Sequence, residues 1–182
     1  MLPRNVFIDT EIFLDNIIPE RRNQFKCSCL LIDEVSKGNL VGVSADYVLS
    51  EIMGNLKTAK EVKKGTAHLS KETLTSAEKA EIQSIVSDVK NIPHLTIFKP
   101  IKEISQMDIY NMVSNLCIQT KDALVLLTAL DARNKLGDIG FLTRDEKLLV
   151  RSRSQINSFH PVAYISKCPS DCQSKLSCSH HK

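Results

Sequence analysis

Apolar residues in this chain fall into short runs separated by longer segments of helical spacing. Five short runs predict buried strands at residues 5–9, 40–44, 95–98, 139–143 and 162–165, because each has the length of a strand. Apolar residues spaced three and four apart predict helices at residues 10–18, 21–37, 45–56, 75–90, 105–116, 122–136 and 145–152. This alternation predicts an α/β fold: a mainly parallel β-sheet flanked by helices on both faces, a Rossmann-like three-layer arrangement.

Polar residues at the helix ends support these boundaries. Thr75 with Glu78, and Ser105 with Asp108, have the spacing of capping boxes, in which two side chains bond the first free backbone N–H groups of a helix. Gly137 follows the apolar segment 123–136 and predicts a helix stop.

The length of 182 residues favours one domain with an appended tail. We assign residues 1–165 to the domain, with residues 57–93 as an extended helical insertion that begins with a lysine-rich stretch. Residues 166–182 are polar and rich in Cys and His, and we expect a flexible tail there.

Composition narrows the function only a little. The net charge of +3 is compatible with a polyanionic partner, but many enzymes have a similar balance. The first apolar stretch is interrupted by Asp9 and Glu11, which does not fit a signal peptide. The longest apolar run, residues 123–130, is too short to span a bilayer. We therefore expect a soluble, cytoplasmic protein.

Four acidic residues stand where strands end or helices begin: Asp9, Glu51, Asp122 and Asp145. In parallel sheets these positions meet at one edge, so the four carboxylates are expected to cluster. Such a cluster is costly unless a cation neutralises it, and Mg²⁺ and Mn²⁺ prefer oxygen ligands. Taken singly, each acid has an ordinary role as a helix cap, a helix-dipole partner or a surface charge.

The segments FIDTEIFLD, YVLSEIMG, KDALVLLTAL and FLTRDEKLL occur in this order between residues 6 and 165. In order and content they resemble the four motifs of PIN-domain ribonucleases, especially the VapC-type toxins of toxin–antitoxin pairs. Each motif is short, so the specificity of the resemblance lies in their combination.

The resemblance implies a function and a set of site residues. Asp9, Glu51, Asp122 and Asp145 would bind Mg²⁺ or Mn²⁺ and act as the catalytic set, with neighbouring hydroxyl groups shaping the substrate site at Thr10 and Thr143. It also implies an RNA substrate, a homodimer and, for a toxin, a small antitoxin protein as partner. An RNA-processing nuclease is the other option.

Two features depart from the family pattern. Glu11 stands where Asn or Ser is usual, and it either adds a fifth charge to the site or faces outward. About seventy residues separate Glu51 from Asp122, more than in the compact toxins.

Several basic residues near these motifs are candidates for phosphate binding. Lys121, Arg144 and Lys147 flank two of the acids, and Arg133 lies further along one helix. Arg144 is the best single candidate because it stands between Thr143 and Asp145. Ordinary surface charge is the alternative for each of them.

The tail contains three cysteines and two histidines, which could bind Zn²⁺ with tetrahedral geometry. They are Cys168, Cys172, Cys178, His180 and His181. Their spacing matches no common zinc finger, so free thiols are favoured over a zinc site.

The remaining cysteines are Cys27, Cys29 and Cys117. Six cysteines in a chain of this length do not indicate a disulfide scaffold. We predict core or surface thiols at these three positions.

The leading hypothesis is a metal-dependent endoribonuclease. The alternative is a PIN-like RNA-binding or scaffold module without catalytic activity, for which loss of an acid would be the expected sign. A phosphohydrolase with Asp9 as nucleophile fits less well, because Glu11 replaces the second Asp of the Asp-x-Asp motif. The sequence has no phosphate-cradling glycine loop, HExxH motif or GxSxG motif.

Overall fold

The computed structural model describes residues 2–63, 74–100, 103–166, 169 and 171–172. Its centre is a five-stranded sheet in the order β3-β2-β1-β4-β5. The strands are β1 (Asn5–Ile8), β2 (Val41–Ala45), β3 (Leu95–Phe98), β4 (Ile139–Leu142) and β5 (Ser158–Phe159). All neighbouring strands pair in parallel, which confirms the predicted α/β class.

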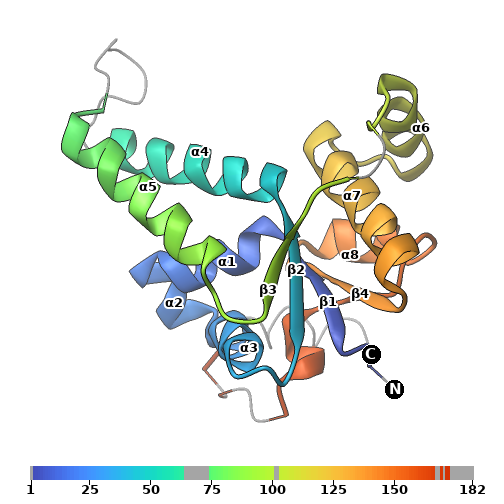
Figure 1. The fold of residues 1–182 in the computed structure, drawn as a ribbon, viewed down its shortest axis with the longest axis horizontal. Helices are drawn as coiled ribbons and strands as arrows, with labels where there is room; N and C mark the ends of the chain where they lie inside the picture. Colours follow the sequence, from blue (N-terminus) through green and yellow to red (C-terminus); the bar gives the residue numbers. More distant parts are fainter. Residues whose placement is uncertain (1, 64–73, 101–102, 167–168, 170, 173–182) are drawn as a thin grey trace.

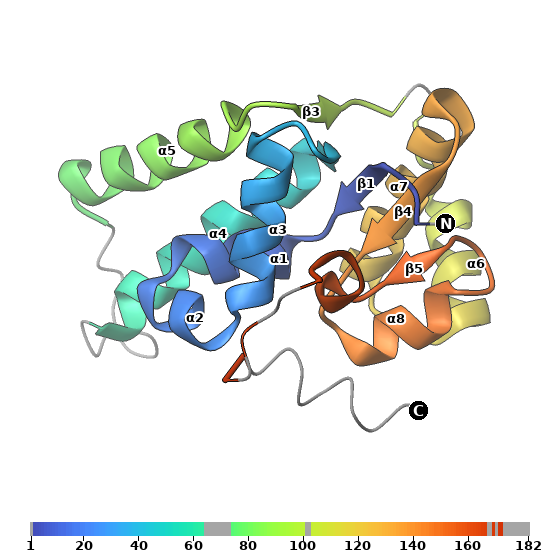
Figure 2. The same cartoon turned by 90° about the horizontal axis from the view of Figure 1, so that it is seen from below.

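Helices cover both faces of this sheet. The first group is α1 (Thr10–Ile17), α2 (Pro19–Gln24), α3 (Lys26–Ser36), α4 (Asp46–Lys63) and α5 (Ser76–Lys90). The second group begins with α6 (Gln106–Leu116) and α7 (Thr120–Leu136), and α8 (Glu146–Ser152) follows β4. Figures 1 and 2 show α1–α5 on one side of the sheet and α6 and α7 on the other.

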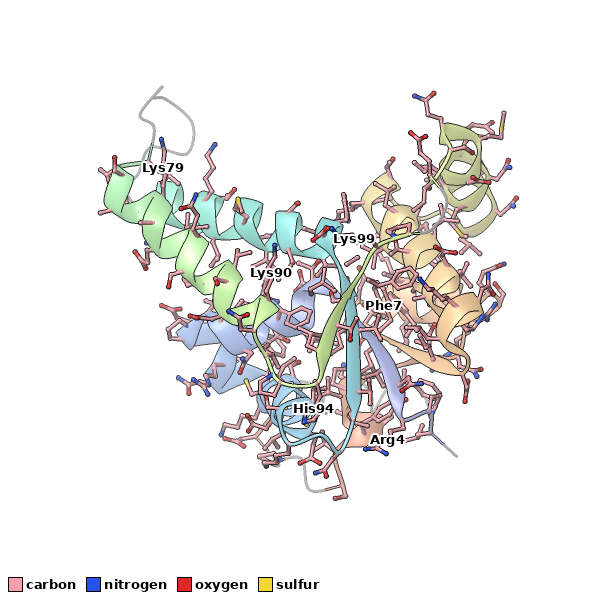
Figure 3. The ribbon with its side chains drawn as sticks, viewed as in Figure 1. Arg4, Phe7, Lys79, Lys90, His94 and Lys99 are labelled. Carbon is pink, nitrogen blue, oxygen red and sulfur yellow. The ribbon has the colours of Figure 1, made fainter. Side chains whose placement is uncertain are left out.

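The core is formed where β1 and β4, two interior strands of the sheet, meet the helices. Phe7 of β1 and Phe141 of β4 are fully buried, with ring centroids 6.1 Å apart. Strands covered on both faces are apolar at successive positions, which explains why the runs in β1 and β4 lack alternation. Phe7 lies in the middle of the molecule in Figure 3.

The path of the chain creates a switch point in the sheet. From β1 the chain adds β2 and then β3 on one side, and it returns through α6 and α7 to place β4 on the other side of β1. All five strands end at the same edge. In Figure 3, Lys99, just after β3, lies toward this edge, whereas Arg4 and His94 lie at the opposite one. Ligands of open parallel sheets bind at the carboxyl ends of strands beside such a switch point.

The last predicted strand was placed wrongly. The residues 162–165 were expected to form it, but Pro161–Tyr164 form a 3₁₀ helix, η1, and the strand is Ser158–Phe159. Pro161 fixes the first turn, and His160 caps it by accepting a bond from the N–H of Val162. The residues before this turn therefore pair with β4.

Two helix boundaries also differ from the prediction. The predicted helix 21–37 is divided at Phe25, whose backbone leaves helical geometry while its ring packs under the guanidinium of Arg144. Helix α4 extends to Lys63 instead of ending at Leu56. It pairs with α5, which runs back along it (Figure 1). Both predicted capping boxes are confirmed, at Thr75 and Ser105.

The cysteine prediction was wrong at one position. Cys27 is disulfide-bonded, whereas Cys29 and Cys117 are free thiols. In the tail, the free thiol of Cys172 is buried and accepts a bond from the N–H of Cys27 at 3.3 Å. The zinc candidates Cys168, Cys178, His180 and His181 lie outside the described residues.

None of the helices in the described part of the chain combines the length and the apolar character needed to cross a membrane.

Candidate active site

A pocket of about 240 Å³ lies at the carboxyl edge of the sheet. The residues that line it are Asp9, Thr10, Glu11, Glu51, Lys121, Asp122, Arg144, Asp145 and Leu148. The structure thus brings together all four acids singled out in the sequence. Asp9 follows β1, Glu51 lies on α4, Asp122 is in the first turn of α7 and Asp145 caps α8.

Asp9 is the most enclosed of these acids, with 7% of its surface exposed. Its Oδ1 accepts a bond from the N–H of Thr10 at 2.7 Å, and its Oδ2 accepts one from Thr143 Oγ1 at 2.7 Å. Burial raises the pKa of Asp9 to about 7, with smaller contributions from the charges of Glu51 and Glu11, although the two hydrogen bonds oppose the rise. A cation in the pocket would favour the ionised form.

The hydroxyl groups of Thr10 and Thr143 both bond acids. Thr10 Oγ1 donates to Glu51 Oε2 at 2.6 Å. Thr143 is fully buried, and its Oγ1 also accepts a bond from the N–H of Asp145 at 3.1 Å, so it links Asp9 to Asp145. Through these contacts the two hydroxyls orient carboxylates that line the pocket, and their role at a substrate site stays a prediction.

Lys121 brings a positive charge to the other side of Glu51. Its Nζ lies 3.2 Å from Glu51 Oε1, and half of its side chain is exposed. Burial opposes the charge of Lys121, but its contacts with Glu51 and nearby acids outweigh burial and raise its pKa. The ammonium group therefore partly neutralises the acids around it.

Asp122 and Asp145 stand at the starts of two helices. Burial raises the pKa of Asp122, and the charges of Asp145 and Glu51 add to the rise, while Lys121 opposes it. Asp145 Oδ1 accepts a bond from the N–H of Leu148 at 2.9 Å, as an ordinary helix cap does. Capping therefore accounts for one oxygen of Asp145, and Asp122 likewise has a hydrogen bond at its helix start, to the backbone of the N-cap residue Gln119.

Glu11 and Arg144 form an ion pair at one side of the pocket, with Arg144 Nη2 2.8 Å from Glu11 Oε2. Of the two options left open for Glu11, the structure places it at the pocket, where it adds a fifth carboxylate. Arg133 and Lys147, the other basic candidates on α7 and α8, are not among the residues that line it.

Two residues near the site were missed in the sequence. Arg21 also bonds Glu11, and Asp15 is fully buried beneath both arginines. The spacing of Glu11 and Asp15 places them on one face of α1, among apolar neighbours. A buried Asp requires a partner, which was the available signal, but nothing in the sequence identified Arg21 as that partner.

The donor set suits a hard divalent cation, because five carboxylates and only two cationic side chains line the pocket. Within the described residues, no group of three or more His, Cys, Asp or Glu side chains is arranged so that it could hold a metal ion. The carboxylates lie too far apart for this because they repel one another and because other side chains already bond some of them. Glu51, for example, accepts bonds from both Thr10 and Lys121. A cation bound by Glu51 would compete with Lys121 for its carboxylate.

Replacing Thr143 with valine should weaken Mn²⁺ binding by about 10- to 100-fold, the usual cost of losing an outer-shell partner. Valine keeps the shape but removes the donor to Asp9 and the acceptor for the N–H of Asp145. Isothermal titration calorimetry measures the affinity, and Thr143→Ser, which retains the hydroxyl, is the control. Equal affinities for the valine and serine variants would show that the hydroxyl has no such role.

Comparison with known proteins yields no family assignment: no protein-family model matches this sequence, and no curated protein matches it.

Proposed function

We propose that this protein is a metal-dependent endoribonuclease that hydrolyses RNA phosphodiester bonds in the pocket at the carboxyl edge of its sheet. The observation that carries the proposal is the excess of acids there: Asp9, Glu11, Glu51, Asp122 and Asp145, against Lys121 and Arg144. Carboxylates this numerous around one pocket repel one another, and the repulsion costs stability unless a cation offsets it.

Asp9, Glu51, Asp122 and Asp145 would hold Mg²⁺ or Mn²⁺. When bound, such an ion lowers the pKa of water and stabilises charge on a phosphodiester. The protein orients the acids through Thr10 and Thr143, and Asp9 must lose its proton before its carboxylate can act as a ligand.

RNA is the proposed substrate because of the resemblance to PIN-domain ribonucleases. The chemistry of the pocket alone would also suit the hydrolysis of other phosphodiesters. The two arginines beside Glu11 place guanidinium donors next to the acids, and guanidinium groups are suited to the phosphates of a polyanionic strand.

Removing divalent ions tests this function. Purified protein incubated with a mixed pool of RNA should cut it in Mn²⁺ or Mg²⁺, and EDTA should abolish the cutting, because the proposed mechanism relies on the ion to lower the pKa of the attacking water and to offset the charge of the phosphodiester. Gel electrophoresis of the products measures cleavage. Cutting that continues at the same rate in EDTA would contradict a metal-dependent mechanism.

A second candidate is an RNA-binding or scaffold module without catalysis. The ion pair between Lys121 and Glu51 favours it, because an ammonium group already supplies part of the charge that a cation would bring. This candidate predicts that the folded protein binds RNA and leaves it intact in Mn²⁺, Mg²⁺ and EDTA alike.

A further inference from the structure

Two guanidinium groups meet at one oxygen atom beside the acidic pocket. Arg21 Nη2 and Arg144 Nη2 both donate to Glu11 Oε2, the second at 2.8 Å. Arg21 belongs to α2, the helix directly after that of Glu11, and Arg144 to the segment between β4 and α8, so two distant parts of the chain converge here. Glu11 and Arg144 both line the pocket that contains Asp9.

The two arginines are held in place by groups other than Glu11. Asp15, which is fully buried, accepts a bond from Arg21 Nε at 2.9 Å, and its Oδ2 lies 3.0 Å from Arg144 Nε. The guanidinium carbon of Arg144 also lies 3.6 Å from the centroid of the Phe25 ring. Asp15 and Phe25 therefore remain as partners of the two cations when Glu11 leaves, although Arg144 loses its hydrogen bond to Glu11.

Glu11 is the member of this group that can leave at the lowest cost. Its side chain is 38% exposed, against 24% for Arg21, 20% for Arg144 and none for Asp15. With Glu11 in place the two arginines and two acids are electrically balanced. Without it the group carries one net positive charge beside a pocket of carboxylates.

A pair of fixed guanidinium groups binds phosphate by the same chemistry that binds a carboxylate. We propose that Arg21 and Arg144 form the phosphate-binding site for an RNA strand, and that Glu11 occupies this site until the strand displaces it. The inference rests on RNA being the substrate of the neighbouring pocket. It assigns a role to Glu11, which departs from the family pattern, and to Arg21, which the sequence did not single out.

The test is RNA binding without cleavage. Fluorescence anisotropy is measured with a short fluorescein-labelled single-stranded RNA of mixed sequence, in EDTA and at low salt, where electrostatic differences are least screened. Glu11→Gln should bind this RNA about tenfold more tightly than the wild type, because it keeps the size of Glu11 but no longer competes as an anion. Arg21→Gln should bind about tenfold more weakly.

Glu34→Gln is the matched control for the charge change, because Glu34 lies on α3 next to the start of β2, at the opposite edge of the sheet. Arg21→Lys is a second test, since it keeps the charge but loses the forked donors, and it should bind more weakly than the wild type. Equal affinities for Glu11→Gln and Glu34→Gln, or no detectable binding by either, would overturn the proposal.

These outcomes separate the binding site from the nuclease. If metal-dependent cleavage is observed but Glu11→Gln and Glu34→Gln bind RNA with equal affinity, the nuclease proposal is supported and the arginine site is refuted. If no cleavage occurs with either metal but Glu11→Gln binds RNA more tightly than Glu34→Gln, the arginine site is supported and the nuclease proposal is refuted.

Discussion

Asp9→Asn should lose more than about a hundredfold in RNA cleavage and, without divalent ions, should be more stable than the wild type. The loss is expected because Asp9 is the most enclosed acid of the pocket, and losing even an outer-shell partner of a metal costs about 10- to 100-fold. The stability gain is expected because the variant has no charge to bury. Asn can still accept the bond from the N–H of Thr10.

The raised pKa of Asp9 determines how the stability advantage of Asp9→Asn changes with pH. Burial raises the pKa of Asp9 from 3.8 to about 7, so the folded protein holds this proton more tightly than the unfolded chain does. Ionising Asp9 therefore costs stability as the pH rises from about 4 to about 7. The advantage of Asp9→Asn should grow through that window and reach about 1–4 kcal/mol above it.

Chemical denaturation in EDTA, at several pH values, measures the difference in the free energy of unfolding. Asp88→Asn, at an exposed position on α5, is the matched control and should show no such trend. A constant difference between Asp9→Asn and the wild type across the pH range would contradict the buried-charge account.

Asp15→Ala should lower the free energy of unfolding by about 3–5 kcal/mol, because it removes the buried acid that two partly buried arginines share. Asp15 is fully buried and bonds Arg21 at 2.9 Å and Ser28 Oγ at 2.7 Å. Urea unfolding followed by circular dichroism measures the loss. Asp15→Asn should lose less, since its amide oxygen still accepts a bond from Ser28.

Asp33→Ala is the control for Asp15→Ala, because Asp33 is an exposed acid on α3. Its substitution should change the free energy of unfolding by less than about 0.5 kcal/mol, as is usual for surface sites. Similar losses for the two alanine variants would show that the buried ion pairs contribute little to stability.

The sequence predicted the structure correctly where helix-capping residues and the spacing of apolar residues agree. The apolar runs of β1 and β4 located both of these interior strands, and the capping boxes at Thr75 and Ser105 located the starts of α5 and α6. Acids placed after strands and at helix starts were expected at one edge, and the structure places all four around one pocket. This part follows from topology, because parallel strands end at the same edge.

The sequence did not predict the structure correctly where contacts between distant segments of the chain determine it. The break at Phe25 coincides with the packing of its ring against Arg144, about 120 residues later in the chain. The last strand was misplaced because Val162 and Ile165 have the composition of a strand, whereas Pro161 and the cap at His160 produce a 3₁₀ turn. The pairing of Arg21 with Glu11 and Asp15 depends on how α2 folds back on α1.

Titration of Mn²⁺ into the folded protein tests the central claim, that the carboxylates of this pocket hold a divalent ion. Calorimetry should detect binding at pH 8 that is about tenfold weaker at pH 6, where Asp9, with a pKa of about 7, is about 90% protonated. Asp9→Asn should bind far more weakly at both pH values. Absence of Mn²⁺ binding by the folded wild type at pH 8, or equal binding by Asp9→Asn, would contradict the account.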